Sequence, residues 1–187
     1  QVMQAIQLIV GPESVTELRI LEGTTDADGR QKTYSGFFTD PEKLAESLGQ
    51  ITSAKGIYIM PNSVAPDLLD RSENELSPAR SGQSASDGDI IGRRWLLIDI
   101  DAIRPSGYSS TDEEHAAALE GAQAIKEYLA GYGWPDPIIA DSGNGAHLLY
   151  RIDLPCDDGG LVQRCLNALA DQFDSGTFSV DKSVHNP

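Results

Sequence analysis

The chain has few cysteines, few basic residues and no long apolar run, and each shortage excludes a class of protein. Its 187 residues include only two cysteines, Cys156 and Cys165, whose spacing does not suit metal ligation. We therefore expect a reduced, cytoplasmic compartment and no structural zinc site. No apolar segment approaches the length of a membrane span, and no basic-then-apolar leader opens the chain, so no membrane partner is expected.

Positive charge is also scarce. Lys and Arg number 14 against 29 Asp and Glu, which gives a formal net charge of −15. This balance disfavours a protein that grips nucleic acid by charge alone. It does not exclude a protein that holds nucleotides through metal ions, because carboxylates at metal sites add to the acidic count. The length suits one generous domain or two small ones that share a core.

The most informative segment is residues 94–101, which read Arg-Trp-Leu-Leu-Ile-Asp-Ile-Asp. Side chains alternate across a strand, so the even-numbered apolar residues face one way, and Asp99 and Asp101 share the other face. Two adjacent carboxylates repel unless a cation lies between them, and a hard divalent ion such as Mg²⁺ or Mn²⁺ is the usual solution. Asp-x-Asp alone is a weak signal, because acids are common at strand ends.

Hydrophobic periodicity and turn residues divide the chain into two parts. Residues 1–88 predict a smaller α/β layer, with a helix at 2–10, strands at 15–21, 33–38 and 56–60, and a helix that Asp40 caps and Gly49 ends. Residues 61–88 are rich in Ser, Pro, Asp and Gly and predict a long connection.

Residues 89–187 predict the order strand, helix, strand, strand, helix, strand. The ranges are 95–101 for the first strand, a helix from the caps at Ser110 and Thr111 to Gly131, strands 138–141 and 146–152, a helix over 161–173, and a strand at 178–181. This is the split βαβ plan, an α+β sheet like that of RNA-recognition motifs, with helices on one face and the other face open.

Alternation places several polar side chains on that open face. Asp99, Asp101, His147, Arg151 and Asp181 converge there, a set that suits phosphoryl chemistry. Three carboxylates can hold one or two metal ions, and His147 can donate hydrogen bonds to phosphate oxygens.

The turn at residues 141–145, Asp-Ser-Gly-Asn-Gly, offers backbone N–H groups that can approach phosphates. Each piece also has a structural alternative: a hydrogen-bonded strand histidine, a routine hairpin turn, and an Asp181–Lys182 surface ion pair.

These motifs resemble the catalytic core of the archaeo-eukaryotic primase superfamily, especially the primase-polymerase domains of plasmids, phages and related mobile elements. The first motif is hydrophobic-Asp-hydrophobic-Asp at residues 98–101. The second is an extended Ser-x-His motif from Ser142 to His147, and the third is Val180-Asp181. Residues 87–94 and 110–115 add to the likeness, which covers roughly the whole chain.

The resemblance implies a single primase-polymerase domain over residues 1–187. Its subregions would be an N-terminal α/β module at 1–88, packed on an RNA-recognition-like catalytic module at 89–187. It implies Asp99, Asp101 and Asp181 as catalytic, metal-binding acids for Mg²⁺ or Mn²⁺. Ser142, Gly143, Gly145 and His147 would bind the nucleotide.

The implied reaction is template-directed synthesis of primers. The implied partners are a single-stranded DNA template, nucleoside triphosphates, and a helicase or C-terminal helical domain outside this chain. Members of the superfamily usually continue past the Asn-Pro at 186–187 with another strand, so part of the catalytic domain is expected to follow.

Three other readings compete with this one. A non-catalytic nucleotide- or nucleic-acid-binding module would keep the same sheet. A sugar-nucleotide transferase would use Asp-x-Asp but would need neither His147 nor Asp181. A rolling-circle initiator would need a His-hydrophobe-His pair, which the sequence lacks. Because the chain is so acidic, a template would contact either a part outside this chain or a small basic patch at Arg80, Arg93 and Arg94.

Overall fold

We describe the protein from a computed structural model, which covers residues 2–11, 14–25, 29–80 and 82–187. The chain forms two compact units. Unit 1 comprises residues 1–93 together with Pro187, and unit 2 comprises residues 94–186. Of the helices in these ranges, none is both long and apolar enough to cross a membrane.

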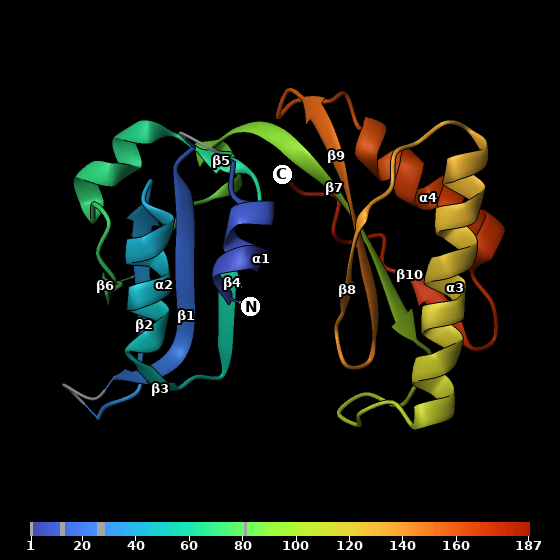
Figure 1. Cartoon of the computed structure of the whole chain (residues 1–187), viewed down its shortest axis with the longest axis horizontal. Coiled ribbons are helices and arrows are strands. Elements are labelled where there is room, and N and C mark those ends of the chain that lie inside the picture. The colour runs from blue at the N-terminus through green and yellow to red at the C-terminus, as the bar shows by residue number, and fades with distance from the viewer. Residues whose placement is uncertain (1, 12–13, 26–28, 81) are drawn as a thin grey trace. The chain divides into compact units, whose positions relative to one another are not determined.

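Unit 1 is an antiparallel sheet with two helices. Its longest strand, β1 (Thr16–Thr25), pairs with β2 (Lys32–Phe38) on one side, and with β3 (Ile51–Ser53) and β4 (Gly56–Ile59) on the other. A two-residue strand, β6 (Ser77–Pro78), continues the sheet beyond β2. The helices are α1 (Val2–Ile9) and α2 (Pro41–Gly49), the second of which runs alongside β1 and β2 in Figure 1.

Alternation along β1 decides which face of this sheet is covered. Leu18 and Ile20 are fully buried in a cluster with Ile6 of α1 and Leu44 of α2. The helix α2 begins as the sequence predicts, because the Asp40 side chain accepts hydrogen bonds from the N–H groups of residues 42 and 43. The odd-numbered residues of β1 therefore lie on the opposite face of the sheet.

The segment between β4 and unit 2 is not the uniform connection that its composition predicts. It contains β5 (Ser63–Val64), the 3₁₀ helix η1 (Pro66–Arg71), β6 and the 3₁₀ turn η2 (Asp87–Asp89). Its short strands pair with distant partners, β5 with residues 90–92 and β6 with β2. Pairing over such sequence distances depends on tertiary context, which is why local composition misses it.

Unit 2 has the element order that the sequence predicts. The long strand β7 (Ile90–Ala102) is followed by α3 (Asp112–Gly131), β8 (Ile138–Asp141), β9 (Gly145–Leu154), α4 (Leu161–Phe173) and β10 (Phe178–Val180). The sheet order is β10-β7-β9-β8, so the two central strands are β7 and β9. The fold class is α+β, as predicted, and the structure shows two antiparallel sheets.

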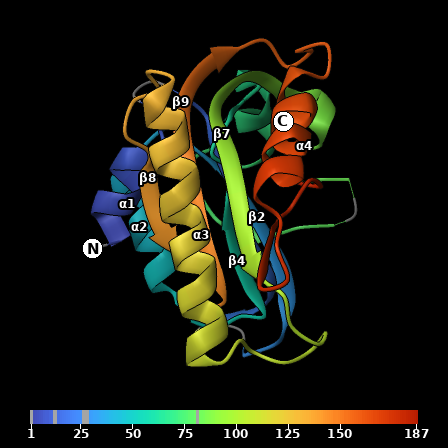
Figure 2. The same cartoon turned by 90° about the vertical axis from the view of Figure 1, so that its right-hand side faces the viewer.

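Both helices of unit 2 cover one face of its sheet (Figure 2). Leu96, Ile98 and Ile100 of β7 are at most 2% exposed and pack in one core with α3 and α4. The start of α3 carries the predicted capping box, in which Thr111 and Glu114 each accept a hydrogen bond from the other's backbone N–H. The opposite sheet face keeps the acids of β7 outside this core.

The core position of Ile98 gives a prediction about stability. Ile98 has no exposed surface, whereas Ile139 on the edge strand β8 is 52% exposed. Ile98→Ala should lower the free energy of unfolding by about 2–5 kcal/mol, because it leaves a cavity under the central strand. The same change at Ile139 should cost less than about 1 kcal/mol. Urea denaturation measures both, and equal losses would contradict this placement of the core.

Candidate active site on the open face of unit 2

Two of the predicted acids, Asp99 and Asp101, lie on β7, and the third, Asp181, directly follows the neighbouring strand β10. β10 pairs with β7 so that Ser179 is opposite Asp101, and the backbone N–H of Asp181 donates to the carbonyl oxygen of Asp99 at 2.8 Å. Directly opposed residues of an antiparallel pair project to the same face. Asp99, Asp101 and Asp181 therefore share the face that α3 and α4 leave uncovered.

His147 reaches the same place from β9. The backbone N–H of Ala102 donates to the carbonyl oxygen of Asn144 at 3.3 Å, and Nε2 of His147 lies 3.4 Å from Oδ1 of Asp99. Ala102 is thus opposite Asn144, and Asp99 is opposite His147. Because the residue numbers increase on one strand as they decrease on the other, β7 and β9 run antiparallel. His147 is thus the cross-strand neighbour of Asp99, as alternation predicts.

Each carboxylate contacts a different group. Asp101 lies 3.6 Å from Nη1 of Arg104, and Asp181 accepts hydrogen bonds from the N–H and hydroxyl of Ser183 at 2.7 and 2.9 Å. Oδ1 of Asp99 is buried and accepts no hydrogen bond, because the 3.4 Å contact with His147 has ion-pair distance but not hydrogen-bond geometry.

In the part of the chain that the structure describes, no three His, Cys, Asp or Glu side chains are gathered as ligands for one ion. The backbone positions of the three acids are therefore adjacent, but their carboxylates do not point to one common ion position.

The neighbouring acids act on the titration of His147. Its contact with Asp99 raises the pKa of the imidazole above its usual value, and this outweighs the opposing effect of partial burial. The charges of Asp99 and, to a lesser extent, Asp101 raise the pKa further. Protonated His147 therefore places a positive charge at ion-pair distance from a buried carboxylate oxygen.

The glycine turn at residues 142–145 is held by its own polar groups. The Gly143 N–H donates to Oδ1 of Asp141 at 2.7 Å, and the Ser142 N–H donates to the carbonyl oxygen of Gly145 at 3.0 Å. Two of the backbone donors that the sequence assigns to phosphate binding are therefore already used within the turn. Ser142 itself is exposed, which leaves its hydroxyl accessible.

The two glycines of the turn are required for different structural reasons. Gly143 adopts a φ of +82°, in the left-handed region that favours glycine. At Gly145, an added Cβ would collide with the carbonyl oxygen of Ile100 on β7. Gly145 therefore permits the close approach of β9 to β7 that sets His147 beside Asp99.

A second histidine supports this turn, and sequence reasoning gave it no role. Nε2 of His115, in the first turn of α3, lies 2.9 Å from Oδ1 of Asp141. The Gly143 N–H and then His115 lower the pKa of Asp141 below its usual value. On the other side of the turn, the Asn144 side chain accepts a hydrogen bond from the Ser110 N–H at 2.9 Å. The only sequence signal was the position of His115 within the segment 110–115.

Beyond the acids, alternation places Trp95 and Arg151 on the open face. Arg151 lies over the ring of Trp95, with its guanidinium carbon 5.5 Å from the ring centroid. Burial, and then repulsion from Arg151, lower the pKa of Arg94. Arg93 is only 7% exposed, so it does not belong to an exposed basic patch of the kind considered from the sequence.

Comparison with known proteins gives no match: no family model, no curated protein and no solved structure is similar to this chain. The likeness to primase-polymerases therefore depends on the quoted motifs and on the positions of their residues in unit 2.

The Asp99–His147 contact leads to a prediction about titration. In the metal-free protein, the pKa of His147 should lie above the usual histidine value of about 6.5, and Asp99→Asn should bring its pKa to or below that value. A raised folded-state pKa stabilises the protein below the unfolded-state pKa, and this contribution is lost as pH rises through the folded-state pKa. The stability difference between wild type and Asp99→Asn should therefore shrink from pH 6 to pH 8.

Nuclear magnetic resonance measures this directly, because the chain has only three histidines. His115→Gln and His185→Gln assign the two other imidazole signals. A His147 pKa that Asp99→Asn leaves unchanged would contradict the proposed electrostatic coupling.

Proposed function

We propose that this chain is a metal-dependent nucleotidyltransferase that synthesises primers on a single-stranded DNA template from nucleoside triphosphates. The observation that carries the proposal is the position of Asp99. Its Oδ1 is buried without a hydrogen-bond donor, and it lies beside His147 and the strand positions of Asp101 and Asp181. A buried carboxylate oxygen with no donor is costly, and a cation removes that cost.

The donor set supports a hard divalent ion. Asp99, Asp101 and Asp181 offer oxygen ligands, which Mg²⁺ and Mn²⁺ prefer. The side chain of Asp99, which carries the oxygen without a donor, is less exposed than that of Asp101. These three residues would hold the ion. When bound, a divalent ion neutralises triphosphate charge and lowers the pKa of the attacking 3′-hydroxyl.

The other residues of the site bind and orient the nucleotide. His147, whose pKa is raised, stays protonated nearer to neutral pH and can donate a hydrogen bond to a phosphate oxygen. Its side chain is 36% exposed, so a phosphate can reach it. The exposed hydroxyl of Ser142 offers a further donor at the turn that His115 and Asp141 hold in place.

One observation favours a non-catalytic nucleic-acid-binding module as the second candidate. Within the described residues the three carboxylates contact different groups and do not form a ready ligand set. In that alternative, the face would bind nucleotide or nucleic acid without transferring a nucleotidyl group. Activity and metal binding distinguish the two.

The activity test measures labelled nucleotide incorporation on a single-stranded template, with and without an annealed primer, in Mg²⁺ or Mn²⁺. Asp99→Asn should reduce incorporation at least about 100-fold, because it removes the buried charge that holds the ion. His147→Gln should reduce it roughly 10- to 1000-fold, because it removes a donor to the phosphate. Asp171→Asn is the matched control, since Asp171 is exposed on α4 and should keep wild-type activity. Wild-type inactivity under all conditions would contradict catalysis by this chain.

A second measurement tests the ion independently of activity. Mg²⁺ at Asp99 repels the proton of His147, so adding Mg²⁺ should lower the pKa of His147 in wild type and not in Asp99→Asn. A pKa that Mg²⁺ does not change would favour the non-catalytic module.

A further inference from the structure

A pocket in unit 1 lies outside the proposed active site. It has a volume of about 330 Å³ on the sheet face that α1 and α2 leave uncovered. Its walls are largely apolar and come from Leu21, Ile59, Met60 and Pro61. Its polar lining residues are Glu17 and Arg19 of β1 and Tyr58 of β4, and Arg19 and Tyr58 occupy directly opposed strand positions.

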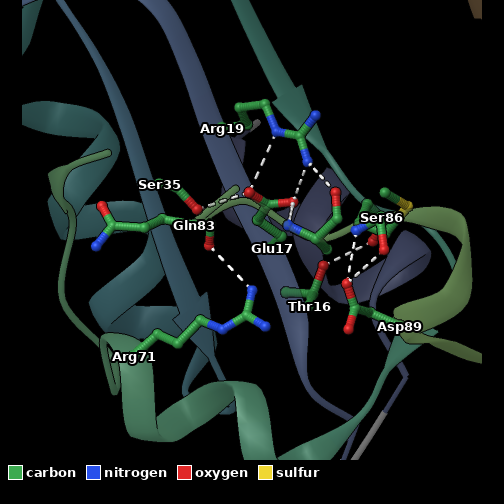
Figure 3. A network of polar contacts seen from close by, with 10 residues as sticks. Thr16, Glu17, Arg19, Ser35, Arg71, Gln83, Ser86 and Asp89 are labelled. Atoms are coloured by element: carbon green, nitrogen blue, oxygen red, sulfur yellow. Dashed lines mark hydrogen bonds and ion pairs between the residues drawn. The ribbon is translucent and has the colours of Figure 1, made fainter. Parts of the chain in front are cut away.

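Arg19 is fixed in one orientation by a buried carboxylate (Figure 3). Its Nε donates to Oε1 of Glu17 at 3.2 Å, and its Nη2 donates to Oε2 of Glu17 at 2.6 Å and to the carbonyl oxygen of Ala85 at 2.8 Å. Its Nη1 donates to none of the residues that the structure describes. One edge of the guanidinium therefore remains available to a ligand.

Glu17 balances the charge of this arginine. It is 1% exposed, and its carboxylate also accepts hydrogen bonds from the Ser35 hydroxyl at 2.6 Å and from the Ala85 N–H at 3.2 Å. The buried carboxylate is thus paired and hydrogen-bonded, as a buried charge must be. Because the two charges cancel, the pocket presents directed N–H donors with little net charge.

Tyr58 offers an aromatic surface beside this donor edge. It is 55% exposed, although its ring rests against the strand: a Cβ added at Gly56 would lie within 2.6–2.9 Å of two ring carbons and the hydroxyl oxygen of Tyr58. Glycine at position 56 therefore lets the ring lie over the backbone. One side of the ring is supported, and the remainder of the side chain is open to the pocket.

These features select a ligand class. A phosphate gains little from an arginine whose charge Glu17 already neutralises, in a chain whose net charge is −15. A planar, uncharged heterocycle with a carbonyl acceptor can stack on Tyr58, contact the apolar walls and accept a hydrogen bond from Nη1 of Arg19. We propose that the Arg19–Tyr58 pocket binds one unpaired base of single-stranded nucleic acid. This inference rests on the proposed function, in which such a strand is the template.

The experiment compares two labelled oligonucleotides of equal length, oligo-dT and the same strand with abasic positions at its centre, by fluorescence anisotropy. Both carry the same phosphates, so the ratio of their dissociation constants isolates base contacts from the salt-dependent backbone term. Wild type should bind oligo-dT about 5- to 100-fold more tightly than the abasic strand, the range for stacking one base. Tyr58→Ala should reduce that ratio to near one, and Tyr58→Phe should keep it.

Two further variants complete the design. Gly56→Ala should also reduce the ratio, because its Cβ displaces the supported ring. Tyr132→Ala is the matched control, since Tyr132 is 71% exposed in unit 2 and should leave the ratio unchanged. Arg19 is left intact, because its removal would leave Glu17 buried and unpaired and could unfold unit 1.

The outcomes separate the pocket from the proposed activity. A wild-type ratio near one, or a ratio that Tyr58→Ala leaves intact, overturns the pocket even if the chain incorporates nucleotides. A Tyr58-dependent ratio in a chain that incorporates none supports the pocket and overturns the catalytic proposal. Asp99→Asn should abolish incorporation while keeping the ratio, which shows that the two sites act separately.

Discussion

The structure of unit 2 depends on the alternation of side chains along β7. Its even-numbered apolar residues are buried against α3 and α4, so its odd-numbered residues must project to the open face. A shift of one residue in register would place Asp99 and Asp101 in the apolar core, at a cost of several kcal/mol for each buried charge. The hydrophobic core and the acidic site are thus two consequences of one pattern.

The strands on either side of β7 supply the other two side chains of the site. β10 sets Asp181 beside Asp99, and β9 sets His147 there, because Gly145 lets the two backbones approach closely. The turn that precedes His147 is tied to the start of α3 by His115 and Asp141. A proposed nucleotide-binding turn is therefore supported from both ends by ordered secondary structure, as precise binding geometry requires.

Unit 1 contains a buried carboxylate on the sheet face that α1 and α2 leave uncovered. Glu17 is buried in the sheet, and Arg19, Ser35 and Ala85 together satisfy its carboxylate. Ala85 belongs to the irregular segment before η2, so that segment completes a buried hydrogen-bond network as well as connecting strands. This explains why a stretch that is poor in hydrophobic periodicity is nevertheless ordered against the sheet.

Local sequence signals were sufficient to predict most helices and strands. The period-2 pattern of β7, the capping residues Asp40 and Thr111, and the helical spacing in α4 each specify their element without tertiary information, and the structure confirms them. The short strands β3, β5 and β6 were missed, and β7 begins five residues earlier than predicted. These strands form only because a distant partner offers hydrogen bonds, which a local reading cannot anticipate.

The sequence by itself determined the α+β class, the element order of unit 2 and the face on which its acids and His147 lie, because side-chain periodicity is a local property. Tertiary structure decided the rest. In unit 2, the Gly143 N–H is hydrogen-bonded within the turn, and each of the three carboxylates contacts a different group. In unit 1, Arg93 is buried, and Glu17 is paired with Arg19 beside Tyr58. Those outcomes depend on distances between residues far apart in the chain, which pattern alone does not fix.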